Sequence, residues 1–206
     1  MVSYPLAHLT QDERQDVSGP IQDDEALVLF ALIRCMRMRA VVEIGGLAGY
    51  SARNFCAAVG PEGTVITIDL VDVPRVAENH VVLRGDALAL DASAYPVDRF
   101  DLIFLDCHDY ATEWGFVNKL TAAGLIDDDT VIALHDTNVH PYQSVPWAYQ
   151  VPEGWVHCPV ERQLANDLQR AGYDAVCLHS RPDRHGPEMP YRHGLTILKK
   201  FHRLGV

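Results

Sequence analysis

The stretch VVEIGGLAGYS at residues 41–51 decides the fold. It begins as an apolar run that only Glu43 interrupts, and it continues into three glycines. A buried strand that ends in a glycine turn and leads into a helix opens a βαβ unit, because glycine lets the backbone turn sharply and approach a ligand closely. The dinucleotide pattern Gly-x-Gly-x-x-Gly fails, since Leu47 and Tyr50 stand where it requires glycine. The pattern that fits is Glu-x-Gly-x-x-x-Gly.

Short apolar runs alternate with helical patterns along the rest of the chain. Their continuous apolarity predicts parallel strands covered on both faces. The last two runs are separated by a proline-containing loop too short for a crossover helix, so we expect them to pair antiparallel. The sequence thus predicts a single-domain, doubly wound α/β fold with a seven-stranded sheet and an antiparallel last strand. The expected strands are 40–46, 64–70, 80–86, 100–106, 130–136, 173–180 and 193–200, and the expected helices are 21–39, 51–60, 114–124 and 160–173.

The length of 206 residues indicates one domain spanning 1–206. Residues 1–38 are expected to form an N-terminal helical arm. Residues 139–160 combine four prolines with aromatic side chains and are expected to form a lid-like insertion. The helix at 21–39 repeats apolar residues at a spacing of three to four, which predicts a buried face made of Ala26, Leu29, Phe30, Ile33 and Met36.

The charge balance argues against two classes of partner. The chain has 17 Lys and Arg against 28 Asp and Glu, a formal net charge of −11, which repels nucleic-acid phosphates and anionic lipid surfaces. Neither a signal peptide nor an apolar run of membrane-spanning length is recognisable, so a cytoplasmic protein is expected. Five cysteines without a Cys-x-x-Cys pair indicate reduced thiols.

An acid at the end of the second expected strand strengthens the reading of the glycine turn. Asp69 follows Gly49 by twenty residues, and a carboxylate there can accept both hydroxyl protons of a ribose. With these motifs the sequence resembles the class I S-adenosylmethionine-dependent methyltransferases. The resemblance runs from about Gln22 to Lys200. It implies S-adenosylmethionine as cofactor, with contacts from Glu43, Gly45, Gly49, Tyr50, Ser51, Asp69, Leu70, Asp86, Ala87 and Asp106.

A second set of polar side chains follows the fourth and fifth expected strands. Asp106 comes after the fourth, and His135 and Asp136 come after the fifth. The carboxyl ends of adjacent parallel strands meet at one edge of a sheet, so these groups could hold a divalent metal. Successive strand side chains alternate faces, so His135 and Asp136 converge only if the strand has begun to turn there. The last strand begins near His193, which could complete the ligand set.

This second set resembles that of metal-dependent small-molecule O-methyltransferases, and more closely the branch that includes macrocin O-methyltransferase and cephalosporin hydroxylase relatives. His135 replaces an acid of the magnesium pattern, and imidazole favours iron, manganese, nickel or zinc over magnesium. The family's Asp-Gly-x-His-x-Tyr segment is one residue shorter here, which leaves either His108 or Asp109 in the general-base position. We favour His108, because its ordinary pKa suits removal of a hydroxyl proton at neutral pH.

The function expected from these residues is S-adenosylmethionine-dependent, metal-assisted O-methyl transfer to a small-molecule metabolite or natural-product intermediate. Three alternatives stay open: a metal-dependent C-methyltransferase of an α-keto acid, a metalloenzyme on the same scaffold that transfers no methyl group, and a binding or regulatory module that only holds the cofactor. The converging His and Asp groups count against the last, because passive cofactor binding does not need them. A homo-oligomer is compatible with the sequence, which does not identify the substrate or the metal.

Overall fold

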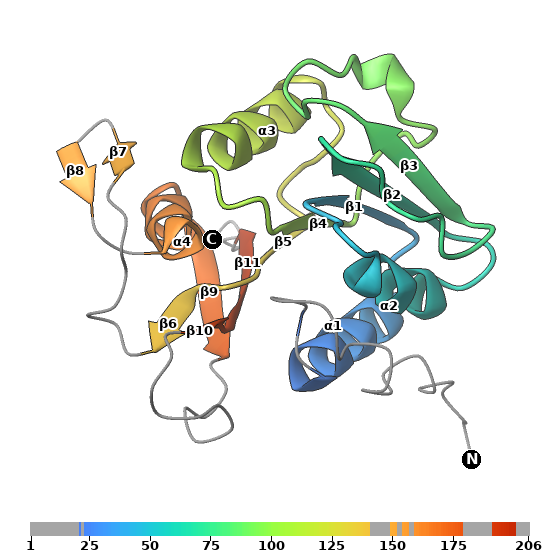
Figure 1. Cartoon of the computed structure of the whole chain (residues 1–206), viewed down its shortest axis with the longest axis horizontal. Coiled ribbons are helices and arrows are strands. Elements are labelled where there is room, and N and C mark those ends of the chain that lie inside the picture. The colour runs from blue at the N-terminus through green and yellow to red at the C-terminus, as the bar shows by residue number, and fades with distance from the viewer. Residues whose placement is uncertain are drawn as a thin grey trace, which may run out of the picture. The chain divides into compact units, whose positions relative to one another are not determined.

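Within the residues that the computed structural model describes, a seven-stranded sheet is accompanied by four α-helices and two small two-stranded sheets (Figure 1). The structure describes residues 21, 23–140, 149–151, 154–156, 159–178 and 191–200, the side chains of 139–140, 149–151, 154–156 and 191–193 excepted. The sheet has seven strands in the order β3-β2-β1-β4-β5-β11-β9. The chain divides into two compact units, Met1–Leu102 and Ile103–Val206, here called the first and second halves.

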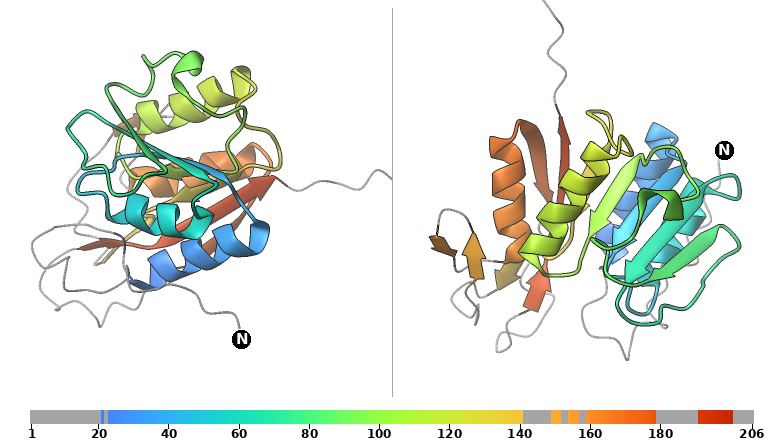
Figure 2. Two further views of the ribbon diagram at one scale, coloured as in Figure 1. Left: turned by 90° about the vertical axis from the view of Figure 1, so that its right-hand side faces the viewer. Right: turned by 90° about the horizontal axis from the view of Figure 1, so that it is seen from above.

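The first half contains the βαβ unit that the glycine turn predicts. Its strands pair in parallel, with β1 beside β2 and β2 beside β3. Helices α1 and α2 pack against each other, and Figure 2 shows both on one side of these strands. The elements are α1 (Asp23–Met36), β1 (Ala40–Ile44), α2 (Tyr50–Val59), β2 (Thr64–Asp69) and β3 (His80–Arg84), followed by a 3-10 turn at Ala92–Ala94.

The second half holds an antiparallel strand inserted between two others. β11 pairs antiparallel with β5 on one side and with β9 on the other. Helix α4 packs on β9 and against α3 (Figure 2). The elements are β4 (Leu102–Leu105), α3 (Tyr110–Ala122), β5 (Val131–Leu134), β6 (Asn138–His140), β7 (Tyr149–Val151), β8 (Gly154–Val156), α4 (Val160–Arg170), β9 (Tyr173–Leu178), β10 (Tyr191–His193) and β11 (Leu195–Lys200).

The predicted fold is confirmed in its strand runs, its parallel βαβ unit and its antiparallel last strand. The predicted buried face of α1 is confirmed at Ala26, Leu29, Phe30 and Ile33. It is wrong at Met36, which is 44% exposed because it is the last residue of the helix. Each helix in the described part of the chain is too short or too polar to span a lipid bilayer.

Part of the predicted domain organisation lies outside the described residues. This applies to residues 1–20 of the expected N-terminal arm and to most of the expected lid-like insertion at 139–160. Within that insertion, β7 pairs antiparallel with β8, and the end of β6 pairs with β10. The single domain and the lid stay predictions.

Candidate active site

The glycine turn joins β1 to α2 and is held by a carboxylate from the next strand. Asp69, at the end of β2, accepts hydrogen bonds through Oδ2 from the backbone N–H groups of Gly46 at 2.9 Å and Leu47 at 3.1 Å. Its Oδ1 accepts from Val71 N–H at 3.1 Å. A carboxylate has about four acceptor sites, so capacity for a further donor remains. Asp69 thus shapes the turn, and its predicted bond to a ribose stays a prediction.

The turn delivers the start of α2 in a conformation that only glycine adopts easily. Gly45 and Gly49 have φ angles of 91° and 77°, in the left-handed region. Gly49 is the N-cap of α2, whose first turn carries no acid. The positive end of the helix dipole lies at such a helix N-terminus and favours an anionic ligand group. Tyr50 and Ser51, both predicted cofactor residues, form the first turn of this helix.

Glu43, fully buried in β1, ends a chain of hydrogen bonds. Val76 N–H donates to His80 Nδ1 at 3.2 Å, which places the ring proton on Nε2. That Nε2–H donates to Thr67 Oγ1 at 2.6 Å, and the Thr67 hydroxyl donates to Glu43 Oε1 at 2.5 Å. Burial, with a smaller effect of Arg75, lowers the pKa of His80, so its imidazole is neutral at pH 7. A carboxylate inside the sheet, which would otherwise cost several kcal/mol, thereby gains a donor.

The remaining predicted cofactor residues of the first half lie after β2 and β3. Asp86 is exposed, and its Oδ1 accepts from Leu88 N–H at 2.8 Å, whereas Ala87 is buried. Leu70 is 71% exposed next to Asp69. Further large apolar side chains are exposed after these strands and in the glycine turn, namely Val71, Leu88 and Leu47.

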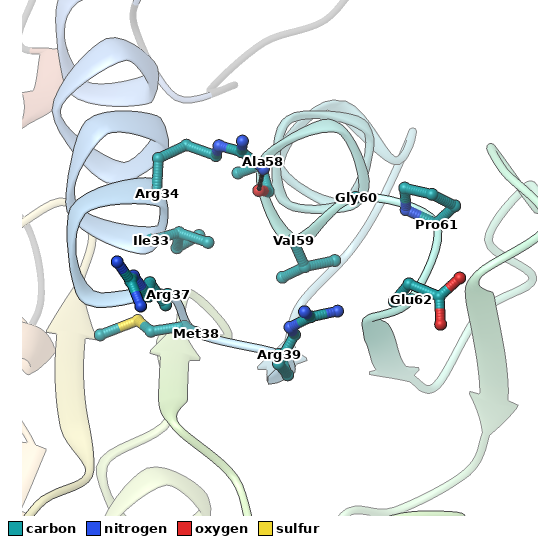
Figure 3. A pocket seen from close by; sticks show the side chains of 10 residues that line it. All are labelled: Ile33, Arg34, Arg37, Met38, Arg39, Ala58, Val59, Gly60, Pro61 and Glu62. Carbon is teal, nitrogen blue, oxygen red and sulfur yellow. Dashed lines mark hydrogen bonds between the residues drawn. The ribbon is translucent and has the colours of Figure 1, made fainter.

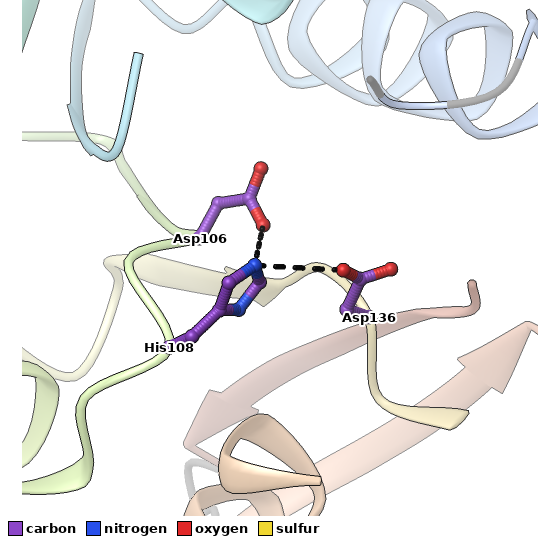
Figure 4. Close-up of side chains that lie close together, drawn as sticks. All are labelled: Asp106, His108 and Asp136. Atoms are coloured by element: carbon purple, nitrogen blue, oxygen red, sulfur yellow. Dashed lines mark ion pairs between the residues drawn. The ribbon is translucent and has the colours of Figure 1, made fainter. Parts of the chain in front are cut away.

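In the second half the ends of β4 and β5 bring three ionisable side chains together (Figure 4). Leu105 C=O accepts from His135 N–H at 3.1 Å, which joins the two strand ends. One ligand atom each of Asp106, His108 and Asp136 lies within 4.8 Å of the others. His108 Nε2 is 3.7 Å from Asp106 Oδ1 and 3.6 Å from Asp136 Oδ2. We call these three residues the strand-end cluster.

The chain turns as soon as β5 ends, which is the condition for convergence. Asp136 has a φ of 53° and His108 a φ of 59°, both in the left-handed region that non-glycine residues avoid. Such conformations cost about 1–3 kcal/mol and persist where surrounding contacts hold them. The strain concentrates at the two residues whose side chains face each other.

His135 lies beside the cluster, next to both of its carboxylates. Its ring is buried, and its Nδ1 lies 3.1 Å from Asp106 Oδ1 and 3.6 Å from Asp136 Oδ1. The ring therefore hydrogen-bonds to a carboxylate through the nitrogen closest to the cluster. The backbone of His193 pairs with Asn138 between β10 and β6, while its side chain lies outside the described part. Ligation by His135 or His193 stays a prediction.

Asp109, the alternative candidate for the general base, caps a helix instead of joining the cluster. The Asp109 side chain caps α3 by accepting from Thr112 N–H at 2.8 Å, and it is exposed. His108, and not Asp109, faces the cluster.

Two buried glutamates that were not predicted from the sequence hydrogen-bond to His108. Glu161 on α4 hydrogen-bonds through Oε1 to His108 Nδ1. Glu113 on α3 accepts through Oε1 from the backbone N–H groups of Cys107 at 3.1 Å and His108 at 3.2 Å. Both glutamates are fully buried. Each lies in the first turn of its helix, where acidic residues are common because they interact favourably with the helix dipole. The sequence pattern therefore did not set them apart.

Acidic groups outnumber basic ones around the cluster, and this raises proton affinity. Burial, outweighing the nearby histidines, raises the pKa of Asp136 to about 7, with Asp106 adding to the rise. The pKa of Glu113 lies well above its usual range, first because of burial and then because of the charge of Glu161. Burial also raises the pKa of the Cys107 thiol, so it is not a thiolate at neutral pH.

A cavity of about 410 Å³ lies at the other end of β1, where α1 and α2 end (Figure 3). Arg34, Arg37 and Arg39 line it together with Glu62. Arg34 Nη1 donates to Ala58 C=O at 3.2 Å, so this guanidinium satisfies the negative end of α2. Arg34 thus has a structural role there, and the cavity lies away from the strand ends where ligands bind in such sheets.

No family model matches the sequence, and neither does any curated protein. Solved structures do match the fold. An O-methyltransferase from Bacillus cereus in complex with S-adenosylhomocysteine is 18% identical, with a TM-score of 0.58 over 91% of this chain and 84% of that one. The O-methyltransferase TomG from Streptomyces achromogenes, involved in tomaymycin synthesis and solved with S-adenosylmethionine, is 19% identical, with a TM-score of 0.59 over 96% and 89%.

A third structure, a Staphylococcus aureus protein assigned as a caffeoyl-CoA O-methyltransferase, is 17% identical, with a TM-score of 0.65 over 95% and 92%. At these identities the likeness shows the fold, which is the Rossmann-like fold of S-adenosylmethionine-dependent methyltransferases. The predicted branch with macrocin O-methyltransferase and cephalosporin hydroxylase relatives stays a prediction.

Gly46 leaves no room for a side chain, which yields a stability prediction. A Cβ at this position would lie 2.1 Å from Thr67 Cγ2. Thr67 cannot rotate away without losing its hydrogen bonds to Glu43 and His80. We therefore expect Gly46→Ala to lower the free energy of unfolding by about 1–3 kcal/mol, measured by chemical denaturation.

Thr67→Ser provides the matched background, because it removes Cγ2 and keeps the hydroxyl. In that background Gly46→Ala should cost less than half as much. An equal cost in both backgrounds would contradict the steric explanation.

The raised pKa of Asp136 predicts how the stability of the metal-free protein depends on pH. The folded carboxyl, with a pKa of about 7, binds its proton more tightly than the unfolded one, at its ordinary 3.8. The resulting contribution to stability is present at low pH and is lost as pH rises through 7. Asp136→Asn should therefore raise the free energy of unfolding at pH 8 and reduce its change between pH 5.5 and 8, measured by urea denaturation with a chelator.

Asp129→Asn is the control, because Asp129 is exposed and pairs with Lys199 at 3.0 Å. It should leave the pH dependence unchanged. A loss of stability at pH 8 in Asp136→Asn would show that the ionised carboxylate is stabilising as it stands.

Proposed function

We propose that the chain is an S-adenosylmethionine-dependent O-methyltransferase acting on a small molecule, assisted by a divalent metal that Asp106 and Asp136 hold. The observation that carries this proposal is the strand-end cluster itself, placed after β4 and β5 of a methyltransferase fold. A fold alone does not imply a function, and a site of suitable chemistry on that fold supports one.

The first half supplies groups that fit the methyl donor. The N-terminus of α2, free of acids, suits the carboxylate of an amino-acid group. Asp69 keeps acceptor capacity for a ribose hydroxyl, and the exposed Leu70 offers an apolar surface for a base. A Cβ at Gly85, after β3, would meet nothing within 4 Å, so the backbone there borders open space. When bound, the donor supplies a methyl group already activated by its sulfonium.

The second half supplies groups that fit a divalent cation. Four carboxylates, those of Asp106, Glu113, Asp136 and Glu161, surround two imidazoles in a largely buried region. Such an excess of negative charge out of water is costly unless protons or a cation offset it. Asp106 and Asp136 present oxygen atoms that divalent metals accept as ligands. When bound, the cation lowers the pKa of a hydroxyl group that coordinates to it.

The residues of the chain then divide the remaining work. Asp106 and Asp136 hold the acceptor side, and His135, bonded to Asp106, fixes the direction of that carboxylate. His108, 35% exposed and facing both aspartates, is placed to take a hydroxyl proton. The net charge of −11 disfavours nucleic acid as the acceptor, and the tomaymycin-synthesis enzyme offers a small-molecule precedent for the fold.

Calorimetric titration of S-adenosylmethionine and of Mn²⁺ into the metal-stripped protein tests both halves of the proposal. Asp69→Asn should lower the affinity for S-adenosylmethionine by about 10–100-fold, which is the effect of losing a charged hydrogen bond. It should leave Mn²⁺ binding unchanged. Asp136→Asn should abolish Mn²⁺ binding and preserve S-adenosylmethionine binding. Asp72→Asn is the matched control, because Asp72 is an exposed carboxylate that pairs with Arg84 at 3.0 Å.

Each outcome has a defined meaning. Without S-adenosylmethionine binding to the wild-type protein, the proposed function fails. With donor binding but no Mn²⁺ binding, the metal is excluded and methyl transfer survives. A methylated product with a new carbon–carbon bond would show that the enzyme is a C-methyltransferase and not an O-methyltransferase.

A further inference from the structure

The His108 ring is fixed by a contact on each of its two nitrogen atoms. Nδ1 hydrogen-bonds to Glu161 Oε1, while Nε2 faces Asp106 and Asp136 at 3.7 and 3.6 Å (Figure 4). The contact at Nδ1 fixes the direction of the ring, so Nε2 points toward the carboxylates of Asp106 and Asp136.

Three ligand atoms, one each from Asp106, His108 and Asp136, lie within 4.8 Å of one another. The distances of 3.6 and 3.7 Å from Nε2 to the two carboxylates are longer than direct hydrogen bonds. A divalent cation accepts both carboxylate oxygen and imidazole nitrogen as ligands, so it suits a set of three atoms at this spacing. Histidines that ligate metals typically donate their other N–H to a carboxylate, which is the arrangement of His108 and Glu161.

The backbone of His108 is fixed as firmly as its ring. Glu113 Oε1 accepts from the N–H groups of Cys107 and His108, and His108 holds a left-handed φ of 59°. Two fully buried carboxylates, one from α3 and one from α4, thus hold a strained residue in one orientation. Their second oxygens, Oε2 of Glu113 and of Glu161, are buried without a hydrogen-bond partner among the residues that the structure describes. Burying these glutamates is costly, so their contacts to His108 call for a role beyond packing.

We infer that His108 Nε2 is a metal ligand alongside Asp106 and Asp136, and that Glu161 and Glu113 are the positioning residues that aim it. This inference rests on the proposed function and deepens it. It replaces His135 by His108 as the nitrogen ligand, because His135 already directs its nearer nitrogen to Asp106. It also removes His108 from the role of free base, since a nitrogen bound to metal cannot accept the proton.

One imidazole among the ligands determines the class of metal. A site of two carboxylates and one imidazole prefers Mn²⁺, Fe²⁺, Co²⁺, Ni²⁺ or Zn²⁺ over Mg²⁺, which favours an all-oxygen shell. Loss of the imidazole should therefore lower the affinity for Co²⁺ strongly and the affinity for Mg²⁺ only a little. A histidine that acts only as a base would leave the affinity for both metals unchanged.

The experiment titrates Co²⁺ and Mg²⁺ separately into the metal-stripped full chain by calorimetry, with the Co²⁺ absorption spectrum as a second signal. His108→Gln should lower the affinity for Co²⁺ by about 100-fold or more and change the spectrum, while the affinity for Mg²⁺ changes by less than about 5-fold. Glu161→Gln should weaken Co²⁺ by about 10–100-fold, as supporting carboxylates do at metal sites. Tyr110→Phe is the control, because it removes a 2.7 Å hydrogen bond from α3 to Asp167 on α4 without touching the cluster.

A second measurement needs no metal. Nitrogen-15 NMR of the histidine rings should show a shifted His108 Nδ1 resonance in Glu161→Leu, because the hydrogen bond to Glu161 Oε1 is lost. A glutamate that only packs against the ring would alter stability and leave this resonance unchanged. Because Glu161→Leu places an apolar group in a polar site, Glu161→Gln serves as the folded alternative, checked by circular dichroism.

The results separate the two proposals. If wild-type protein binds S-adenosylmethionine and Co²⁺ but His108→Gln binds Co²⁺ equally well, this inference is overturned and the proposed function stands. If wild-type protein binds no divalent metal, this inference and the metal-assisted part of the function fail together. If it binds no S-adenosylmethionine but retains the His108-dependent Co²⁺ site, the ligand assignment holds and the methyltransferase proposal fails.

Discussion

The exclusion of water from three glutamates imposes the main constraint on this structure. Glu43, Glu113 and Glu161 are fully buried, and each lies next to a segment that carries the candidate chemistry. A buried carboxylate must find donors, because its desolvation otherwise costs several kcal/mol. Glu43 receives the hydroxyl of Thr67, while the two helix glutamates hold the backbone and the ring of His108. The hydrogen bonds that these buried glutamates require thereby fix the positions of residues at the strand ends.

Most of the fold could be predicted from the sequence because its signals are local. A buried parallel strand appears in the sequence as a continuous apolar run. The turn after β1 requires glycine, because its backbone adopts left-handed angles that other residues avoid. The antiparallel pairing of β11 with β9 followed from the short connection between them. Met36 was misjudged because helical spacing continues to the last residue of α1, whereas the packing partners do not. The segments rich in proline gave composition without a pattern.

The candidate site was predictable only in part. Asp106 and Asp136 were found because a polar residue directly after an apolar strand is conspicuous. The choice between His108 and His135 depends on ring orientation and on the left-handed backbone of His108, and neither leaves a trace in the sequence. Glu113 and Glu161 look like ordinary acids in the first turn of a helix. Glu113 contacts the backbone of His108 from only five residues further along the chain. Glu161 lies 53 positions after His108, and its contact depends on the packing of α4 against α3.

The inserted strand β11 also sets an order of assembly during synthesis. Its Thr196 pairs with Leu134 of β5, which the ribosome adds about 60 residues earlier. At 5–20 residues per second, β5 waits roughly 3–12 s for this partner. The strands β1 and β2, paired from Ala40 with Thr64, wait for about 24 residues only. The nascent chain can thus complete the β1–β2 pair while the antiparallel edge of β5 is still open, and that open edge is the segment a chaperone would need to protect.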